Sequence, residues 1–80
     1  MSWDLKWRPA AIAALRAMPW RQAARVDRAV MRFATKGEGW VERVEGDPTG
    51  LRLHAPPYVA ILDVDSETTR LRVLAVYRRG

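Results

Sequence analysis

The chain has 80 residues, a formal net charge of +5 and no cysteine. This length predicts a single domain over residues 1–80, because it leaves no room for a second hydrophobic core. The lack of cysteine excludes disulfides, thiolate nucleophiles and thiolate metal sites. The first residues do not have the pattern of a signal peptide, and no apolar run approaches the roughly 20 residues of a membrane span. We therefore expect a cytoplasmic protein without a membrane partner.

Basic side chains are strongly biased toward arginine. Twelve of the fourteen cations are arginine, and only Lys6 and Lys36 are lysine. The planar guanidinium group binds phosphates and stacks on bases, so the bias favours a nucleic-acid or an acidic protein partner. Codon usage in a GC-rich genome would explain the same ratio. The positions of the arginines therefore carry more weight than their number.

The N-terminal half predicts a short strand followed by two helices. Alternation of apolar and polar residues over residues 3–7 indicates a strand with one buried face. Pro9 suits the first turn of a helix over residues 9–18, and Pro19 both ends that helix and can start the next one. The second helix extends to Lys36, where a cation followed by Gly37 marks its end.

The second predicted helix has two different sides. Its apolar stripe consists of Trp20, Ala23, Val26, Val30 and Phe33, while Arg21, Arg25, Arg28 and Arg32 recur on the other side. The two helices therefore predict an antiparallel hairpin over residues 9–36 that packs its apolar stripe on another layer.

The C-terminal half predicts four strands, over residues 40–44, 51–55, 58–64 and 70–77, separated by turns rich in Gly, Pro and Asp. The order β-α-α-β-β-β-β favours an α+β fold, in which the helical hairpin packs on one face of a curved, mostly antiparallel sheet of four or five strands. We expect the side chains of Val26, Val30, Phe33, Ile61 and Val73 to be buried.

Metal and cofactor chemistry has little support in the sequence. One histidine without cysteine does not form a zinc site of ordinary composition. Asp63 and Asp65 begin a stretch that resembles a calcium loop, but the positions that require glycine and glutamate hold Thr68 and Leu74. We expect no metal and no cofactor. The two aspartates form an ordinary solvated strand end, and the alternative is an acid/base or metal-binding role.

Basic residues on the strands form the candidate site. Arg52 and His54 are two residues apart on a strand and point the same way, while Arg78 and Arg79 end the last strand. If these strands are neighbours, the four residues line one concave basic face, opposite the helices, that would hold phosphates. His54 would then move a proton near neutral pH. The alternative is that they are solvated residues at strand ends.

Trp40 stands in a more polar region than the other three tryptophans. It is a candidate for stacking on a nucleic-acid base, and the alternative is a role in the core or in an interface.

The stretch GLRLHAPPYVAILDVDSETTRLRVLAVYRR, residues 50–79, resembles the C-terminal half of the RelE/ParE toxins of bacterial type II toxin–antitoxin modules. The opening strand, the Pro-Ala helix start and the Met-Pro corner between the helices fit as well, so the resemblance covers residues 3–79. RelE-like members cut messenger RNA in the ribosomal decoding site, using basic residues on the sheet. The resemblance therefore implies an RelE-like fold and a possible ribosome-dependent endoribonuclease.

By position, the resemblance implies catalytic roles for Arg52, His54 and Arg79. Arg78 stands beside Arg79. Arg52, Arg78, Arg79 and the stacking candidate Trp40 would bind the RNA.

Two features depart from the family pattern. The arginine that usually follows the motif's tyrosine is Val59, after Tyr58, and Gly80 stands where members continue into a tail with a further tyrosine or histidine. We expect first a toxin that inhibits translation by ribosome-dependent mRNA cleavage, with a cognate antitoxin, the ribosome and mRNA as partners. The alternatives are a ParE-like inhibitor of DNA gyrase or a catalytically impaired relative of the same fold, and a small basic adaptor without toxicity.

Overall fold

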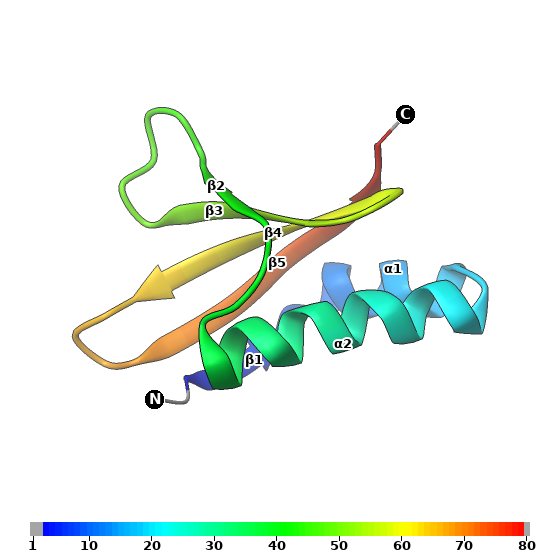
Figure 1. Cartoon of the computed structure of the whole chain (residues 1–80), viewed down its shortest axis with the longest axis horizontal. Coiled ribbons are helices and arrows are strands. Elements are labelled where there is room, and N and C mark those ends of the chain that lie inside the picture. Colours follow the sequence, from blue (N-terminus) through cyan, green and yellow to red (C-terminus); the bar gives the residue numbers. More distant parts are fainter. Residues whose placement is uncertain (1–2, 80) are drawn as a thin grey trace.

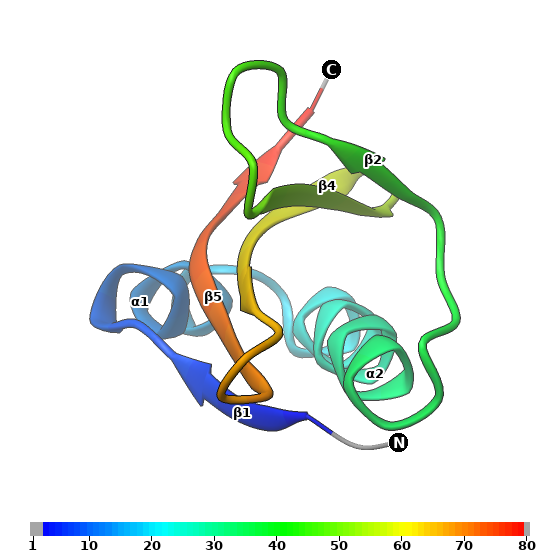
Figure 2. The same cartoon turned by 90° about the vertical axis from the view of Figure 1, so that its left-hand side faces the viewer.

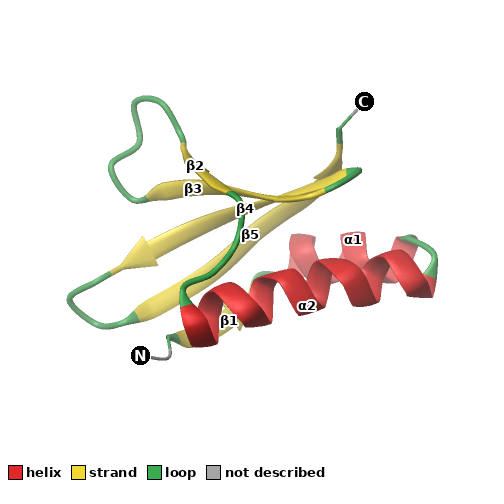
Figure 3. Ribbon diagram, in the orientation of Figure 1, coloured by secondary structure: helices red, strands yellow, loops and turns green. Residues whose placement is uncertain are grey.

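The computed structural model describes residues 3–79. Its elements follow the predicted order of one strand, two helices and four strands (Figure 1, Figure 3). They are β1 (Asp4–Trp7), α1 (Pro9–Ala17), α2 (Trp20–Lys36), β2 (Val41–Arg43), β3 (Gly50–Ala55), β4 (Tyr58–Asp65) and β5 (Arg70–Arg78). The predicted α+β class and the order of its elements are confirmed.

The strands form one five-stranded sheet in the order β1-β5-β4-β3-β2. β1 pairs with β5 in parallel, and the other three pairings are antiparallel. β5 therefore lies inside the sheet, between β1 and β4, while β1 and β2 are its edges. Figure 2 shows the sheet curving over α2, as the sequence predicted.

Both helices begin and end close to the predicted residues. α1 begins at Pro9 and stops before Met18, whose extended backbone is the conformation that a following proline favours. α2 ends at Lys36, and Gly37 adopts a left-handed φ of 69° while its N–H donates to the Phe33 carbonyl at 2.9 Å. A side chain at this position would be strained, because only glycine enters this region freely.

The two helices lie on one side of the sheet, which we call the inner face; the opposite side is the outer face (Figure 1). The core forms between the inner face and the helices, where Val26 and Val30 from α2 meet Val73 from β5. All three are buried, as predicted. The helical hairpin therefore covers the inner face and leaves the outer face of the sheet open.

Ile61 is only half-buried, so its predicted place in the core is wrong. Side chains alternate along β4, and Tyr58, Ala60 and Leu62 take the inner positions. Because residues 58–64 are almost uniformly apolar, their order does not reveal which set faces the helices. Ile61 consequently lies on the outer face.

The apolar stripe predicted on α2 is also narrower than expected. Phe33, which we expected to be buried, is only half-buried and packs against the border of the core. Trp20 is 75% exposed at the corner between the helices, where the Arg21 guanidinium carbon lies 5.3 Å from the centre of its ring. The first residue of α2 therefore contributes nothing to the core.

Candidate nucleic-acid interface

The candidate site lies on the outer face, where β3, β4 and β5 run side by side. His54 on β3 is the cross-strand partner of Val59 on β4, and Val59 is in turn the partner of Tyr77 on β5. These three residues therefore form one row across the sheet. Arg79 follows directly after β5, and its N–H donates to the Pro57 carbonyl at 2.8 Å, which holds it beside the start of β4.

His54 is held by two neighbours from the β2 segment. Its ring stacks on Trp40, with ring centroids 4.3 Å apart and an angle of 25° between the planes. Its Nε2 atom pairs with the Glu42 carboxylate. His54 is only 8% exposed, whereas Trp40 is 60% exposed. The predicted proton carrier therefore lies beneath an exposed indole, in contact with a carboxylate that is itself accessible.

A hollow of about 340 Å³ opens beside this group on the outer face. Its lining comes from the start of β2, the end of β3 and the start of β4, together with the C-terminal arginine: Trp40, Glu42, His54, Pro56, Pro57, Tyr58, Val59 and Arg79. We call it the outer hollow. It brings together an exposed cation, an exposed aromatic ring and a histidine–carboxylate pair.

The four predicted basic residues do not form one continuous cluster. Arg79 and His54 meet in the outer hollow, and Arg52 lies on the same side of β3 as His54 but does not line that hollow. Arg78 does not line that hollow: it is the cross-strand partner of Tyr58, and its guanidinium carbon is 5.9 Å from the centre of the Tyr58 ring. The Tyr58 hydroxyl donates to Gln22 on α2 at 2.6 Å, so Arg78 belongs to the inner side.

Val59 occupies the floor of the outer hollow. Its side chain is 1% exposed and it stands where the family pattern has an arginine. The centre of the outer face is therefore apolar, and its charged groups stand at the border of the hollow.

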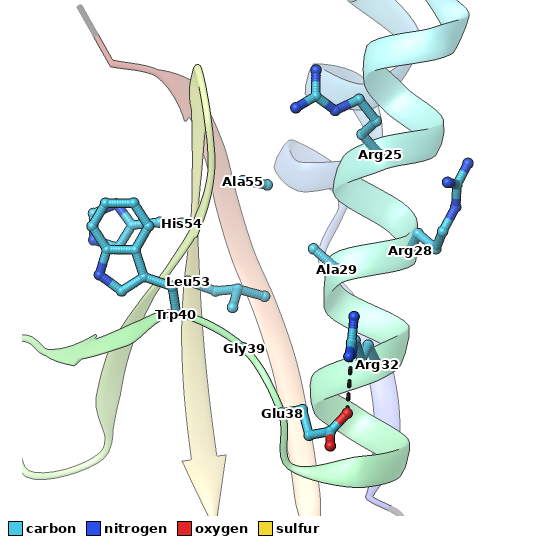
Figure 4. Close-up of a pocket in the computed structure, with 10 residues that line it drawn as sticks. All are labelled: Arg25, Arg28, Ala29, Arg32, Glu38, Gly39, Trp40, Leu53, His54 and Ala55. Atoms are coloured by element: carbon cyan, nitrogen blue, oxygen red, sulfur yellow. Dashed lines mark hydrogen bonds and ion pairs between the residues drawn. The ribbon is translucent and has the colours of Figure 1, made fainter.

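A second hollow, of about 460 Å³, lies between α2 and the end of β3 (Figure 4). Leu53 and Ala55 point from β3 toward α2, whereas His54 and Trp40 lie on the other side of the strand. Residues from α2, from the following loop and from β3 line this helix groove: Arg25, Arg28, Ala29, Arg32, Glu38, Gly39, Trp40, Leu53, His54 and Ala55. Trp40 and His54 thus border both hollows.

The opposite end of the outer face holds an ion pair. Asp63 accepts hydrogen bonds from the Thr49 hydroxyl and from Arg72 Nη2, each at 2.6 Å. The Thr49 hydrogen bond and the Arg72 guanidinium hold the pKa of Asp63 below its usual value of 3.8. Within residues 3–79, no three metal-binding side chains come together. Asp63 is therefore an ionised member of a surface network.

Glu42 is the member of the site that sequence reasoning missed. It lies on β2 opposite Arg52, which brings its carboxylate diagonally to His54. The turn at residues 46–50 joins the two predicted strands, so pairing them in register would have placed Glu42 on the His54 side. Trp40, in contrast, is exposed as its position in a polar stretch of the sequence suggested.

The sequence matches no protein family and no curated relative. Among solved structures, the RelBE2 toxin–antitoxin complex from Mycobacterium tuberculosis matches 99% of this chain and 93% of its own, with a TM-score of 0.85 and 16% identity. The archaeal RelE–RelB complex from Pyrococcus horikoshii matches 100% and 98%, with a TM-score of 0.84 and 19% identity. The chromosomal ParDE system from Pseudomonas aeruginosa matches 98% and 97%, with a TM-score of 0.76 and 17% identity.

This chain therefore has the fold that RelE and ParE toxins share. The resemblance that the C-terminal half suggested is confirmed as a likeness of fold over nearly the whole chain. Within residues 3–79, neither helix is both long enough and apolar enough to span a membrane.

Proposed function

We propose that this chain is the toxin of a type II toxin–antitoxin module and inhibits translation in the cytoplasm by cleaving mRNA on the ribosome. The fold supports the toxin class. The observation that carries the proposal further is the outer hollow, where Arg79 and Trp40 stand at the border and the His54–Glu42 pair lies between them. A guanidinium that binds the phosphate and a proton acceptor both promote RNA cleavage, and an aromatic ring that stacks on a base positions the substrate.

Each group has a role in this proposal. Arg79 would bind the scissile phosphate and neutralise the charge that develops on it, with Arg52 holding a neighbouring phosphate. The 2′-oxygen attacks phosphorus as its proton passes to the His54–Glu42 pair. The bond to the 5′-oxygen breaks, which leaves a 2′,3′-cyclic phosphate, and the departing 5′-oxygen takes a proton from water to become a 5′-hydroxyl. A positioned proton acceptor contributes about 10²–10⁴-fold to the rate. Glu42 is the exposed half of the pair and therefore the half that the ribose would meet.

Induced expression in a bacterial host tests the proposal. The native chain should arrest growth, stop incorporation of labelled methionine and produce discrete mRNA ends that primer extension maps. Arg79→Ala should relieve the arrest, because it removes the group that binds the scissile phosphate. The variant should remain folded, because an exposed arginine after the end of β5 adds little to the core. Arg70→Ala, an exposed arginine at the opposite end of β5, is the matched control and should remain toxic. Translation arrest that persists in Arg79→Ala would contradict the assigned role.

Inhibition of DNA gyrase by the same fold is the second candidate, and Val59 is the observation that favours it. Val59 is apolar and lies at the floor of the outer hollow, where the family pattern has a phosphate-binding arginine. An inhibitor that acts only by binding gyrase needs no catalytic residues. In the same cultures, loss of plasmid supercoiling with continued protein synthesis would support gyrase inhibition over mRNA cleavage. A chain that leaves growth unaffected would instead fit a basic adaptor.

The proposed partner is a cognate antitoxin. The structures with this fold include RelE–RelB and RelBE complexes, and a chain with net charge +5 should attract an acidic partner segment that folds on contact. The affinity should fall as salt rises, because the attraction is partly between surface charges. Copurification of the product of an adjacent reading frame, measured at low and high salt, checks this expectation.

A further inference from the structure

Four arginines form a straight stripe along α2. Arg21, Arg25, Arg28 and Arg32 are all exposed, and their spacing of four, three and four residues keeps them on one side of the helix. The stripe is about 17 Å long at a rise of 1.5 Å per residue. We call it the arginine stripe. Figure 4 shows three of its members, Arg25, Arg28 and Arg32, extending from the helix, and Arg32 reaches Glu38.

The helix gains nothing from this arrangement. Consecutive members of the stripe are like charges at i+3 or i+4, which destabilise a helix, and Arg21 stands in the first turn, where the helix dipole disfavours a cation. Of the four members of the stripe, only Arg32 has an ion-pair partner within residues 3–79, Glu38 at 3.0 Å. The charge is therefore available to something outside the chain.

The helix groove connects this stripe to the outer hollow. β2 pairs with β3 as far as Leu53, and His54 N–H still donates to the Trp40 carbonyl at 2.8 Å. Beyond this point only β4 lies beside β3, so its other edge is free of a strand and borders the helix groove. Trp40 and His54 border both hollows at this edge. A flexible chain seated at Arg79 can therefore pass over the exposed face of Trp40 and continue along α2.

We infer that the arginine stripe and the helix groove bind the backbone of single-stranded RNA that continues from the outer hollow. This inference rests on the proposed function in so far as RNA occupies that hollow. The groove floor consists of Ala29, Leu53 and Ala55, which are small or nearly buried and offer no large apolar anchor for a protein partner. Regularly spaced guanidinium groups beside the exposed indole of Trp40 instead match a chain of phosphates and flat bases.

Binding of a fluorescein-labelled 15-nucleotide oligouridylate to the purified full chain tests the inference. Fluorescence anisotropy would be measured over a series of salt concentrations. The variant Arg25→Gln/Arg28→Gln removes two members of the stripe, and Arg16→Gln/Arg70→Gln removes the same charge from two exposed positions elsewhere. Circular dichroism should show that both variants keep the helices.

Two phosphate contacts correspond to a change of about 1.4 in the slope of log affinity against log salt for a single strand, or roughly a 60-fold loss of affinity at about 50 mM salt. We expect this loss for the stripe variant and less than a threefold change for the control. Equal losses of RNA affinity in both variants would overturn the inference, because they would indicate that the net charge of the chain alone determines binding. Unchanged RNA binding in the stripe variant together with lost antitoxin binding would also overturn it and would identify a protein interface.

The same assay separates this inference from the proposed function. Suppose that the native chain binds RNA, that Arg79→Ala binds it more weakly and that the stripe variant binds it as well as the native chain. In that case the stripe inference fails and the proposed function stands. If the stripe variant loses RNA affinity but expression leaves translation intact, the proposed function fails and the stripe remains an RNA-binding surface. A native chain without measurable affinity for the probe refutes the stripe.

Discussion

Substituting arginine for Val59 tests whether the apolar floor of the outer hollow limits activity. Val59 is 1% exposed and lies between its cross-strand partners His54 and Tyr77, so a longer side chain has no space within the row. It would have to extend into the outer hollow of about 340 Å³, where Glu42 offers a carboxylate to the new guanidinium. The substitution would thus place a second cation opposite Arg79.

The structural effect of Val59→Arg should be moderate. Forcing a larger side chain into a packed position typically destabilises by about 1–3 kcal/mol. The aliphatic stem of arginine covers part of the surface that valine covered, which favours the lower half of that range. For a chain of this size, each kcal/mol lowers Tm by roughly 4–8 °C. A new phosphate-binding group should at the same time raise the cleavage rate by about 10²-fold.

Thermal unfolding and primer extension on ribosome-bound mRNA measure the two effects separately. Val59→Leu is the matched control, because it enlarges the side chain without adding charge. We expect both variants to unfold at lower temperature and only Val59→Arg to cleave faster. If Val59→Arg remains folded and cleaves no faster than Val59→Leu, the outer hollow does not hold the scissile phosphate.

Three further outcomes follow from the structure. Asp63→Asn should lower the free energy of unfolding near neutral pH, because it disrupts the ion pair with Arg72. Since the pKa of Asp63 is depressed in the folded chain, the native protein should keep this advantage in stability above about pH 4 and lose it as the pH falls further. Urea titrations at several pH values would measure the difference. Arg28→Glu should stabilise the chain by about 0.5–1 kcal/mol, since it replaces two like-charge contacts on α2 with attractive ones. An unchanged or lower urea midpoint would show that the arginines of the stripe do not repel one another measurably. Trp40→Ala should weaken oligouridylate binding about 5- to 100-fold while Trp40→Phe retains most of it, and equal binding by both variants would show that the exposed ring does not stack on a base.

Local signals in the sequence were sufficient for the elements and their order. Pro9, Pro19 and Gly37 restrict the backbone directly, so the helix ends lie within about one residue of the predictions. The faces of β4 were not predictable, because nearly every residue of the strand is apolar and the alternation that would identify the inner set is absent. The pairing of β1 with β5 likewise depends on contacts between distant residues, which no local pattern specifies.

The candidate site was predictable where strand alternation alone decides orientation. Arg52 and His54 share the outer side of β3 as expected, whereas Arg78 and Arg79 separate because adjacent residues at a strand end point to opposite faces. The burial of His54 was not visible in the sequence, since it depends on Trp40, which lies opposite His54 just before β2 and stacks on its ring.

The position of β5 has a consequence for proteolysis. This strand separates β1 from the rest of the sheet and leads directly into Arg79, so one short segment completes both the sheet and the proposed phosphate site. The turn before it, around Ser66, is exposed, as preferred cleavage sites are. A single cut there would yield two fragments that are each incomplete, and mixing them would allow β5 to insert between β1 and β4 again. The fold thus lends itself to a split form whose activity returns only when both pieces are present.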